Sequence, residues 1–188
     1  MTGDGQHVLD FLLSRRSRPP KFLTGPAPDR TAIETMLTAA ARVPDHGKLE
    51  PWRFIVLGEE ASRAFAQAIH ARAEAAGKDG AKGALPFEQP PLTIAVVACP
   101  RPTDRIPAIE QTLSAGAACL SLLNAALAGG WGAAWMTGWP AYDRPLLEAE
   151  LGLAPEEWIA GFVHVGTVAA VPPDRPRPDL ARIVDWRA

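Results

Sequence analysis

The segment Ile109–Ala128 is the longest helical pattern in the chain and constrains the fold more than any other stretch. Leucine and alanine recur in it at three- and four-residue spacing, so it is apolar over much of its circumference. Its first half is rich in serine, alanine and glycine, small residues that let another backbone approach closely. We therefore expect this helix either in the middle of the core or in a subunit interface.

Apolar runs elsewhere in the chain predict the strands of a sheet. Leu92–Ala98 is continuously apolar and bounded by prolines, which is typical of a central strand. Residues Ile55 to Leu57 could likewise be buried on both faces. The expected strands are Trp52–Leu57, Leu92–Ala98, Trp131–Thr137 and Ile159–Val168.

Shorter amphipathic patterns predict further helices. The expected segments are His7–Arg16 with Asp4 as a possible N-cap, Asp29–Arg42 with a capping box of Thr31 and Glu34, Glu59–Ala76, and Arg144–Leu151 capped by Asp143. Gly77–Pro91 has little periodicity and is expected to be a mobile connector or lid. Three or four strands with about five helices indicate an α+β or α/β sandwich. We expect one domain over residues 1–188, in which residues 172–188 form a proline-rich extended tail.

Composition excludes several classes of protein. The 188 residues are 47% hydrophobic and 21% charged, as in ordinary globular domains. A net charge of −2 and a pI near 6.1 give no basic field for nucleic acid. Glycine, asparagine or charged residues interrupt each apolar run, so we expect no membrane span and no targeting segment. Cys99 and Cys119 lack a C-x-x-C spacing, which favours buried thiols and a cytoplasmic location.

The loop Arg42–Phe54 reads R-V-P-D-H-G-K-L-E-P-W-R-F and joins an expected helix to an expected strand. It brings an imidazole, cations, carboxylates and an indole together, and loops of this kind often carry function. The alternative is that its Asp, His and Lys side chains are solvated turn residues.

Several kinds of site lack their motifs. The dinucleotide fingerprint G-x-G-x-x-G, the phosphate-binding loop G-x-x-x-x-G-K-[ST] and the nucleophile elbow G-x-S-x-G do not occur. His46 and Glu50 are four residues apart, but Gly47 and Pro51 argue against a helix that would place them on one face as metal ligands. We therefore expect no metal site.

The remaining polar groups suit a planar phosphorylated cofactor. Arg15, Ser17 and Arg42 could hold a phosphate, and the tryptophans near glycines, Trp131, Trp135 and Trp139, could cover rings. Simpler roles stay open. Arg15 and Arg16 could neutralise a helix C-terminus, His46 could cap a turn, and Trp131 and Trp139 could be core or interface anchors.

Five motifs in fixed order then resemble the flavin-dependent nitroreductase family, most closely its short, minimal members. They span residues 7–168, and the P-D-H-x-x-x-x-P-W pattern is the most specific of them. The motifs are R-R-S at Arg15–Ser17, A-R-V-P-D-H-G-K-L-E-P-W-R-F at Ala41–Phe54, S-A-G at Ser114–Gly116, G-W-G-A-A-W-M-T-G at Gly130–Gly138 and G-F-V-H-V-G-T at Gly161–Thr167.

The resemblance implies an α+β, FMN-binding fold with a central, mostly antiparallel sheet flanked by helices. It implies a homodimer with FMN sites at the subunit interface and NADH or NADPH as reductant. Arg15, Arg16 and Ser17 would hold the phosphate and ribityl chain, Arg42 and His46 would come from the other subunit, and Trp135, Met136 and Thr137 would run beside the isoalloxazine. Ala125, Ala126, Leu127, Ala128, Gly129 and Gly130 match a segment assigned in close relatives to the nicotinamide nucleotide.

The implied activity is hydride transfer from NAD(P)H to flavin and then to a nitroaromatic, quinone or similar acceptor, with ping-pong kinetics. The flavin carries this chemistry, so no side chain is expected to be catalytic; Arg18 or Lys21 could place a cation near its pyrimidine edge. One departure matters, because close relatives have Arg where this chain has Met136. That loss leaves open an alternative, a non-redox flavin-fold protein that binds a nucleotide or small ligand.

Overall fold

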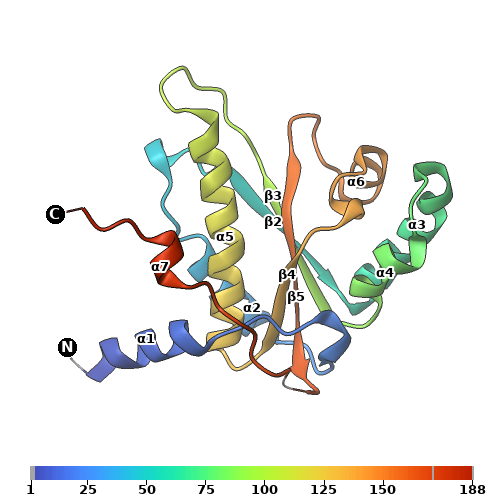
Figure 1. Ribbon diagram of the computed structural model, residues 1–188. Coiled ribbons are helices and arrows are strands. Elements are labelled where there is room, and N and C mark those ends of the chain that lie inside the picture. Colours follow the sequence, from blue (N-terminus) through green and yellow to red (C-terminus); the bar gives the residue numbers. More distant parts are fainter. Residues whose placement is uncertain (1–2, 171, 188) are drawn as a thin grey trace.

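The computed structural model describes residues 3–170 and 172–187, and its centre is a five-stranded antiparallel sheet (Figure 1). The longest strand, β5, pairs with β1, β3 and β4, and β3 lies between β5 and β2. The predicted α+β class and antiparallel sheet are therefore confirmed. The strands are β1 Leu23–Thr24, β2 Trp52–Gly58, β3 Leu92–Ala98, β4 Gly132–Met136 and β5 Trp158–Val168.

Helices cover both faces of this sheet. Two of them, α2 and α5, bury their apolar sides in a cluster on one face, while α3, α4 and α6 build a second cluster on the other. The α-helices are α1 Gly3–Ser14, α2 Arg30–Ala40, α3 Glu59–Ala76, α4 Gly80–Glu88, α5 Ala108–Ala128, α6 Arg144–Leu151 and α7 Leu180–Ile183. Three short 3-10 helices are η1 Pro20–Phe22, η2 His46–Lys48 and η3 Trp139–Ala141.

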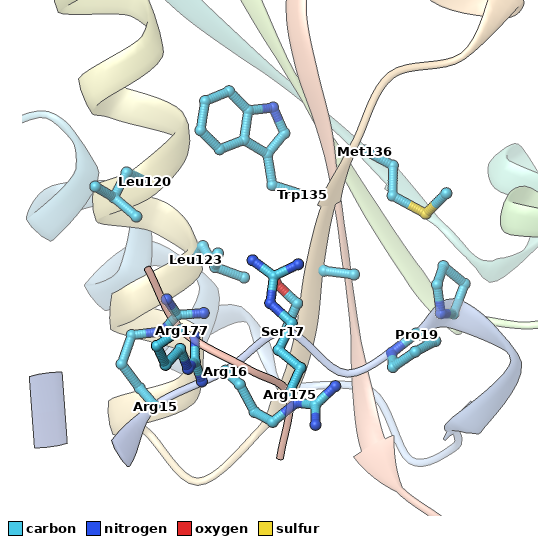
Figure 2. A pocket seen from close by; sticks show the side chains of 12 residues that line it. Arg15, Arg16, Ser17, Pro19, Leu120, Leu123, Trp135, Met136, Arg175 and Arg177 are labelled. Carbon is cyan, nitrogen blue, oxygen red and sulfur yellow. The ribbon is translucent and has the colours of Figure 1, made fainter. Parts of the chain in front are cut away.

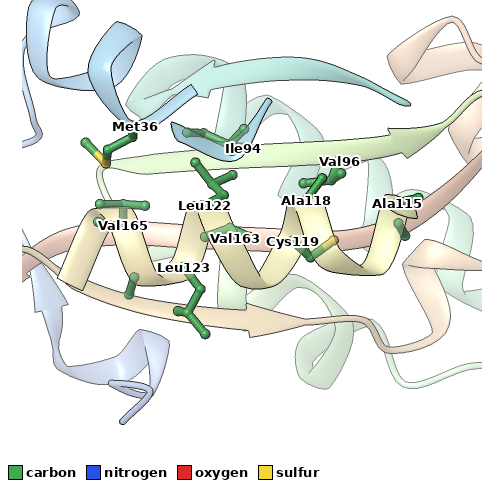
Figure 3. Close-up of a cluster of buried hydrophobic side chains, with 14 of the residues drawn as sticks. Met36, Ile94, Val96, Ala115, Ala118, Cys119, Leu122, Leu123, Val163 and Val165 are labelled. Atoms are coloured by element: carbon green, nitrogen blue, oxygen red, sulfur yellow. The ribbon is translucent and has the colours of Figure 1, made fainter. Parts of the chain in front are cut away.

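The long helix α5 is the core element that its pattern predicts (Figure 3). Ala118, Cys119 and Leu122 are fully buried and lie against Ile94 and Val163 of the sheet. Full burial of a side chain the size of Leu122, Ile94 or Val163 contributes about 1.5–3 kcal/mol of transfer free energy. The same helix also has an exposed apolar side, formed by Ile109, Leu113 and Leu120.

Length and composition alone would allow α5 to cross a membrane, which its interrupted apolar runs did not predict. It is the one such helix among the residues that the structure describes, and 44% of its most apolar window is buried inside the protein. That buried side packs on the sheet, which accounts for its apolar composition.

The first two helices begin and end differently from the prediction. Helix α1 begins at Gly3, so Asp4 lies within it, and it ends at Ser14, ahead of the R-R-S motif. Helix α2 is capped by the Asp29 carboxylate, which accepts a hydrogen bond from the Ala32 N–H at 2.8 Å. The expected capping box is wrong, because Glu34 instead accepts from the Nε of Arg30 at 2.7 Å.

Two further expectations are wrong in the middle of the chain. The predicted connector or lid Gly77–Pro91 contains α4, whose Phe87 packs in an edge-to-face arrangement on Phe65 of α3 and on Phe162 of β5. Strand β2 is an edge strand, and Val56 is 42% exposed, so β2 is not buried on both faces.

Residues 172–179 form neither helix nor strand, and the single turn α7 follows. The tail expected to be extended over residues 172–188 therefore contains one helical turn. It returns along the side of the molecule that carries α1 and α5, so both chain ends lie there (Figure 1).

Candidate functional site

A cavity of about 500 Å³ lies between α5, the end of β4, the segment after α1 and the C-terminal tail (Figure 2). We call it the cationic cavity, because four of its lining residues are arginines. It is lined by Arg15, Arg16, Ser17, Pro19, Pro20, Leu120, Leu123, Ala134, Trp135, Met136, Arg175 and Arg177.

Two backbone hydrogen bonds, one on each side of the R-R-S motif, place it in this cavity. The Arg15 N–H closes the last turn of α1 on the Phe11 carbonyl oxygen at 2.7 Å. Three residues later the Arg18 N–H donates to the carbonyl oxygen of Ala133 in β4, also at 2.7 Å. The intervening residues are thus held beside β4, next to Trp135 and Met136.

The arginines of this cavity lack anionic partners for several of their nitrogens. Arg15 Nε and Arg16 Nη1 are buried and have no hydrogen-bond acceptor among the described residues; the same holds for Nη1 of Arg18, which follows the motif but does not line the cavity. Burial lowers the pKa of Arg15, and the positive charges of Arg177, Arg175 and Arg18 lower it further. Buried donors without acceptors cost free energy, which an anion with several oxygens would recover.

One carboxylate does reach this group of cations, from the tail. Asp174 accepts a hydrogen bond from Arg177 Nη2 at 2.8 Å and is 70% exposed. A hydrogen bond from the Arg175 backbone lowers the pKa of Asp174 most, followed by its contact with Arg177 and the charge of Arg16. A single exposed carboxylate leaves the cavity with a net positive charge.

The wall opposite the arginines is apolar and suits a flat ring. The Trp135 indole packs on the backbone of Gly161 in β5, where any side chain would collide with it. Its Nε1 donates to the Ala160 carbonyl oxygen at 3.3 Å. With Leu120 and Met136 nearby, the residues fit FMN. The arginines would hold its phosphate, and the β4 edge would lie beside its ring.

Arg42 and His46 lie outside this cavity. Both are exposed, and the Nδ1 of His46 is 2.6 Å from Glu110 Oε2 at the start of α5. Within one chain the structure does not bring them to Arg15 or Trp135. Their approach to the flavin from a second subunit stays a prediction.

The loop that carries His46 is nevertheless well ordered by hydrogen bonds. The Asp45 carboxylate accepts from the backbone N–H groups of Leu49 and Glu50 at 3.1 and 2.9 Å. The Ser114 hydroxyl of α5 donates to the Pro44 carbonyl oxygen at 2.7 Å and accepts from the Trp52 indole at 3.1 Å. Asp45 and Ser114 therefore shape this loop, which argues against a freely solvated turn.

The predicted nicotinamide segment, Ala125–Gly130, forms the end of α5 and the following turn. Ala125 and Ala128 line a separate apolar cavity of about 480 Å³ beside Phe11 and Leu12 of α1. None of the six residues lines the cationic cavity. Their contact with a nicotinamide nucleotide stays a prediction.

The sequence reasoning missed Arg175 and Arg177. Both lie in the P-D-R-P-R-P run of the tail, which the pattern predicted only as an extended surface segment. Their side-chain type was the available signal, because arginine is over-represented where proteins bind phosphate.

A second cavity, of about 810 Å³, adjoins the first, and we call it the aromatic cavity. Thr137 lines this cavity and not the cationic one. The two share Pro19, Pro20, Trp135 and Met136. It is lined by Pro19, Pro20, Lys21, Lys82, Gly83, Leu85, Pro86, Trp135, Met136, Thr137, Gly138, Trp139 and Pro140. Among the described residues no group of three or more His, Cys, Asp or Glu could hold a metal ion.

Comparison with known proteins identifies the family of this chain. A model of the family described as "Nitroreductase family" matches residues 12–167. The chain belongs to the nitroreductase family. The resemblance to this family that the sequence motifs indicated is thereby confirmed.

Individual nitroreductases agree with the family match. The Escherichia coli (strain K12) protein named "Putative NAD(P)H nitroreductase YdjA" is 35% identical over 165 residues, which cover 85% of this chain and 87% of that protein. A nitroreductase-like family protein from Bacillus cereus has a TM-score of 0.81 at 23% identity, with 95% of each chain covered. The FMN and NADPH-dependent nitroreductase NfnB from Sphigopyxis sp. strain HMH has a TM-score of 0.77 at 19% identity, with 96% of this chain and 98% of that chain covered. The two structures support the fold.

Proposed function

We propose that this nitroreductase holds FMN in the cationic cavity and uses it to pass electrons from NADH or NADPH to a nitroaromatic, a quinone or a similar acceptor. The observation that carries the proposal is the set of buried arginine nitrogens without acceptors, which lies beside the exposed Trp135 indole. The phosphate binds among Arg15, Arg16, Arg175 and Arg177, and the ring lies along Trp135–Thr137.

When bound, FMN supplies two-electron hydride chemistry, and the chain supplies binding and orientation. The arginines neutralise the phosphate and fix one end of the cofactor. The Trp135 and Met136 side chains form an apolar surface that excludes water from beside the ring. Reductant and acceptor use the same cleft in turn, so steady-state kinetics are ping-pong.

The active form in this proposal is a homodimer. Exposed apolar side chains gather on α1, α5 and the tail, on the side where both chain ends lie (Figure 1). Exposed apolar side chains concentrated on neighbouring elements commonly mark a protein interface. The exposed residues are Val8, Leu9, Leu12, Leu13, Ile109, Leu113, Leu120, Leu180, Ile183 and Trp186.

This arrangement also gives Arg42 and His46 a role. Arg42 follows the C-terminal end of α2, and His46 lies in η2 against Glu110 at the start of α5. A second copy packed on α5 can bring both residues to the flavin of its partner. The free, buried thiols Cys99 and Cys119 suit the reducing conditions of the cytoplasm.

Anaerobic reduction tests the function directly. Protein reconstituted with FMN and freed of excess cofactor is mixed with NADH or NADPH, and flavin absorbance is followed. We expect bleaching by at least one of the two, and recovery of colour when a quinone is added. Bound flavin that neither nucleotide bleaches would favour the non-redox alternative. Protein that stays colourless after reconstitution would contradict FMN binding.

A further inference from the structure

We propose that the aromatic cavity is the acceptor site, and that Lys21 and Lys82 select planar aromatic acceptors that carry a carboxylate. The inference rests on the proposed function and names the substrate class of the same site.

The walls of the aromatic cavity suit a flat, apolar body. The indoles of Trp135 and Trp139, the thioether of Met136 and the side chains of Leu85 and Pro86 line it. Aromatic rings and a thioether attract the faces and edges of other aromatic rings. About 810 Å³ is within the range for pockets that hold small ligands. A benzene or naphthalene ring with substituents therefore fits.

Packing fixes the side of the cavity that α4 forms. The Trp139 Nε1 donates to the Asp79 carbonyl oxygen at 3.1 Å, which ties η3 to the N-terminal end of α4. Gly83 of α4 faces this indole so closely that an added Cβ would collide with it. The indole is thereby held against a helix that is itself packed on α3, and the cavity does not depend on ligand binding to form.

The charges at the aromatic cavity are positive. Lys21 lies on η1 and Lys82 on α4, so two separate elements each contribute a lysine to its lining. No Asp or Glu lines the cavity, and neither lysine forms an ion pair within the described parts of the chain. The Lys21 ammonium lies 5.0 Å from the centroid of the Phe22 ring, which orients its stem. A carboxylate on the ligand would pair with these two cations.

The shared wall places this ligand next to the cofactor. Pro19, Pro20, Trp135 and Met136 line both cavities, so a ring in the aromatic cavity adjoins a flavin that is anchored in the cationic cavity. For a nitro acceptor the balanced step is the loss of one N–O bond. The nitro group gains two electrons and two protons and becomes a nitroso group and water, while NAD(P)H is oxidised to NAD(P)⁺ and solvent supplies the second proton.

The test compares 4-nitrobenzoate with its neutral isostere 4-nitrobenzamide on the FMN-loaded protein. The variants are Lys21→Met, Lys82→Met and the double variant. Lys78→Met is the matched control, because Lys78 is exposed at the end of α3 and lines neither cavity. Calorimetry on the oxidised protein gives the Kd of each compound without turnover, and steady-state kinetics give kcat/KM.

We expect the wild-type protein to prefer 4-nitrobenzoate. Each single substitution at Lys21 or Lys82 weakens its binding and lowers its kcat/KM about threefold to tenfold, the range for a charge-assisted contact that water partly screens. 4-Nitrobenzamide binding changes less than about twofold, and Lys78→Met changes neither compound.

Three results would overturn the inference. In the first, wild-type protein binds the two compounds equally; in the second, Lys82→Met weakens both compounds alike. In the third, the lysine variants lose FMN while the Kd of 4-nitrobenzoate is unchanged, which would assign the aromatic cavity to the cofactor. In all three cases flavin reduction by NAD(P)H can persist. Failure of the proposed function would instead appear as unreduced or unbound flavin in the wild-type protein.

Discussion

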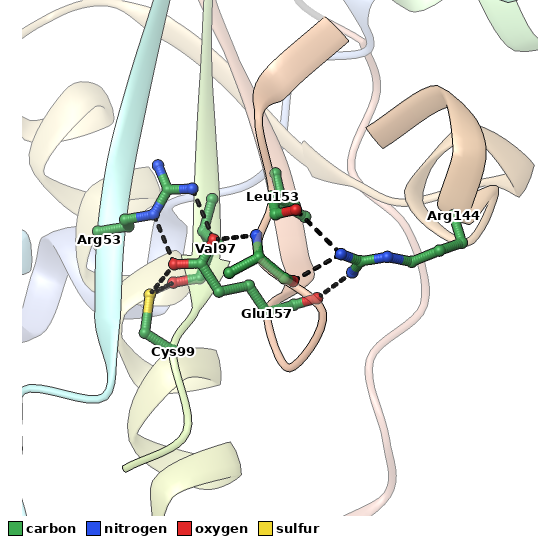
Figure 4. Close-up of polar contacts among 7 residues, drawn as sticks. Arg53, Val97, Cys99, Arg144, Leu153 and Glu157 are labelled. Carbon is green, nitrogen blue, oxygen red and sulfur yellow. Dashed lines mark hydrogen bonds and ion pairs between the residues drawn. The ribbon is translucent and has the colours of Figure 1, made fainter. Parts of the chain in front are cut away.

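The Arg53 guanidinium and the Glu157 carboxylate form a bidentate ion pair, with Nε–Oε1 and Nη2–Oε2 distances of 2.8 and 2.7 Å (Figure 4). The pair joins the edge strand β2 to the turn that leads into β5. Glu157 also accepts from the Ala154 N–H at 3.0 Å, and Arg144 Nη2 donates to the Leu153 carbonyl oxygen at 3.0 Å. Arg53 and Arg144 therefore stabilise the turn that precedes β5.

We expect Arg53→Met to lower the free energy of unfolding by about 2–3 kcal/mol. The substitution keeps an apolar stem but leaves the Glu157 carboxylate, whose side chain is 13% exposed, without its cation. Urea denaturation measures the change. Arg30→Met is the control, since Arg30 forms an exposed pair on α2 and its loss is expected to cost less than about 0.5 kcal/mol. Equal effects of the two substitutions would contradict the structural role of Arg53.

The Arg53–Glu157 ion pair also makes the free energy of unfolding fall at acidic pH. The hydrogen bonds from Arg53 contribute most to holding the pKa of Glu157 at about 2, below its ordinary value. The folded-state pKa is depressed, so the stabilisation is present above the ordinary carboxyl pKa of about 4.5 and is lost as the pH falls toward 2. In Arg53→Met the unfolding free energy should depend less on pH in this window.

A buried histidine gives a second pH window. His164 of β5 is buried, its Nδ1 is 2.9 Å from the Thr93 hydroxyl, and burial lowers its pKa to about 3. The unfolded chain binds a proton below the ordinary pKa of about 6.5 while the folded chain does not. The contribution of His164 to the free energy of unfolding is therefore fully present above pH 6.5. Below that pH the free energy of unfolding falls by up to about 1.4 kcal/mol per pH unit. We expect His164→Gln to remove this slope in urea denaturation between pH 6.5 and 5; an unchanged slope would contradict a neutral buried imidazole.

Local signals predicted the elements that do not depend on distant contacts. Helices α3 and α6 begin and end where periodicity and, for α6, the Asp143 cap placed them. Helix α4 was missed because it contains glycines and Pro86, which oppose a helix locally. It is stabilised by the packing of Phe87 on α3 and by the fit of Gly83 to Trp139, both contacts between residues far apart in sequence.

The sequence predicted some residues of the candidate site and missed others. The R-R-S motif and the Trp135–Met136 pair were assigned to one site, and they line one cavity. Arg175 and Arg177 reach that cavity only because the tail folds back across it, and no local pattern encodes that path. In the proposed homodimer, the position of His46 relative to the flavin depends on the second subunit, and no local sequence pattern specifies how the two subunits pack.

The phosphate role of the arginines is tested by FMN affinity. We expect Arg15→Gln and Arg177→Gln each to raise the Kd of FMN about tenfold or more, because each removes a charge-assisted hydrogen bond to the phosphate. Calorimetric titration of the apoprotein with FMN measures this. Arg187→Gln is the control from the same tail, since Arg187 is exposed, pairs with Asp185 and does not line the cavity. His70 of α3 contacts Glu88 and does not line the cavity, so FMN retention in Arg15→Ala equal to that in His70→Ala would show that Arg15 is not the anchor.

The dimer proposal predicts that Leu113→Asp yields monomers. Leu113 is 65% exposed on the apolar side of α5, and a carboxylate there would be buried without a partner in each copy of the interface. We expect the dimer Kd to rise at least about a hundredfold in sedimentation equilibrium, with loss of bound FMN. Tyr142→Asp is the control at an exposed aromatic outside α1, α5 and the tail. A monomeric wild-type protein that retains FMN would refute the proposal.

The last prediction concerns Met136, which lies on the wall between the two cavities. Met136→Arg places a cation beside the proposed ring position, where reduction adds negative charge, so the reduced cofactor is stabilised more than the oxidised one. We expect the two-electron reduction potential to rise by about 30 mV, which corresponds to about 1.4 kcal/mol. Spectroelectrochemical titration of the FMN-loaded variant measures it. Met136→Leu keeps the apolar shape and should leave the potential unchanged; a similar rise in both variants would indicate an effect of packing instead of charge.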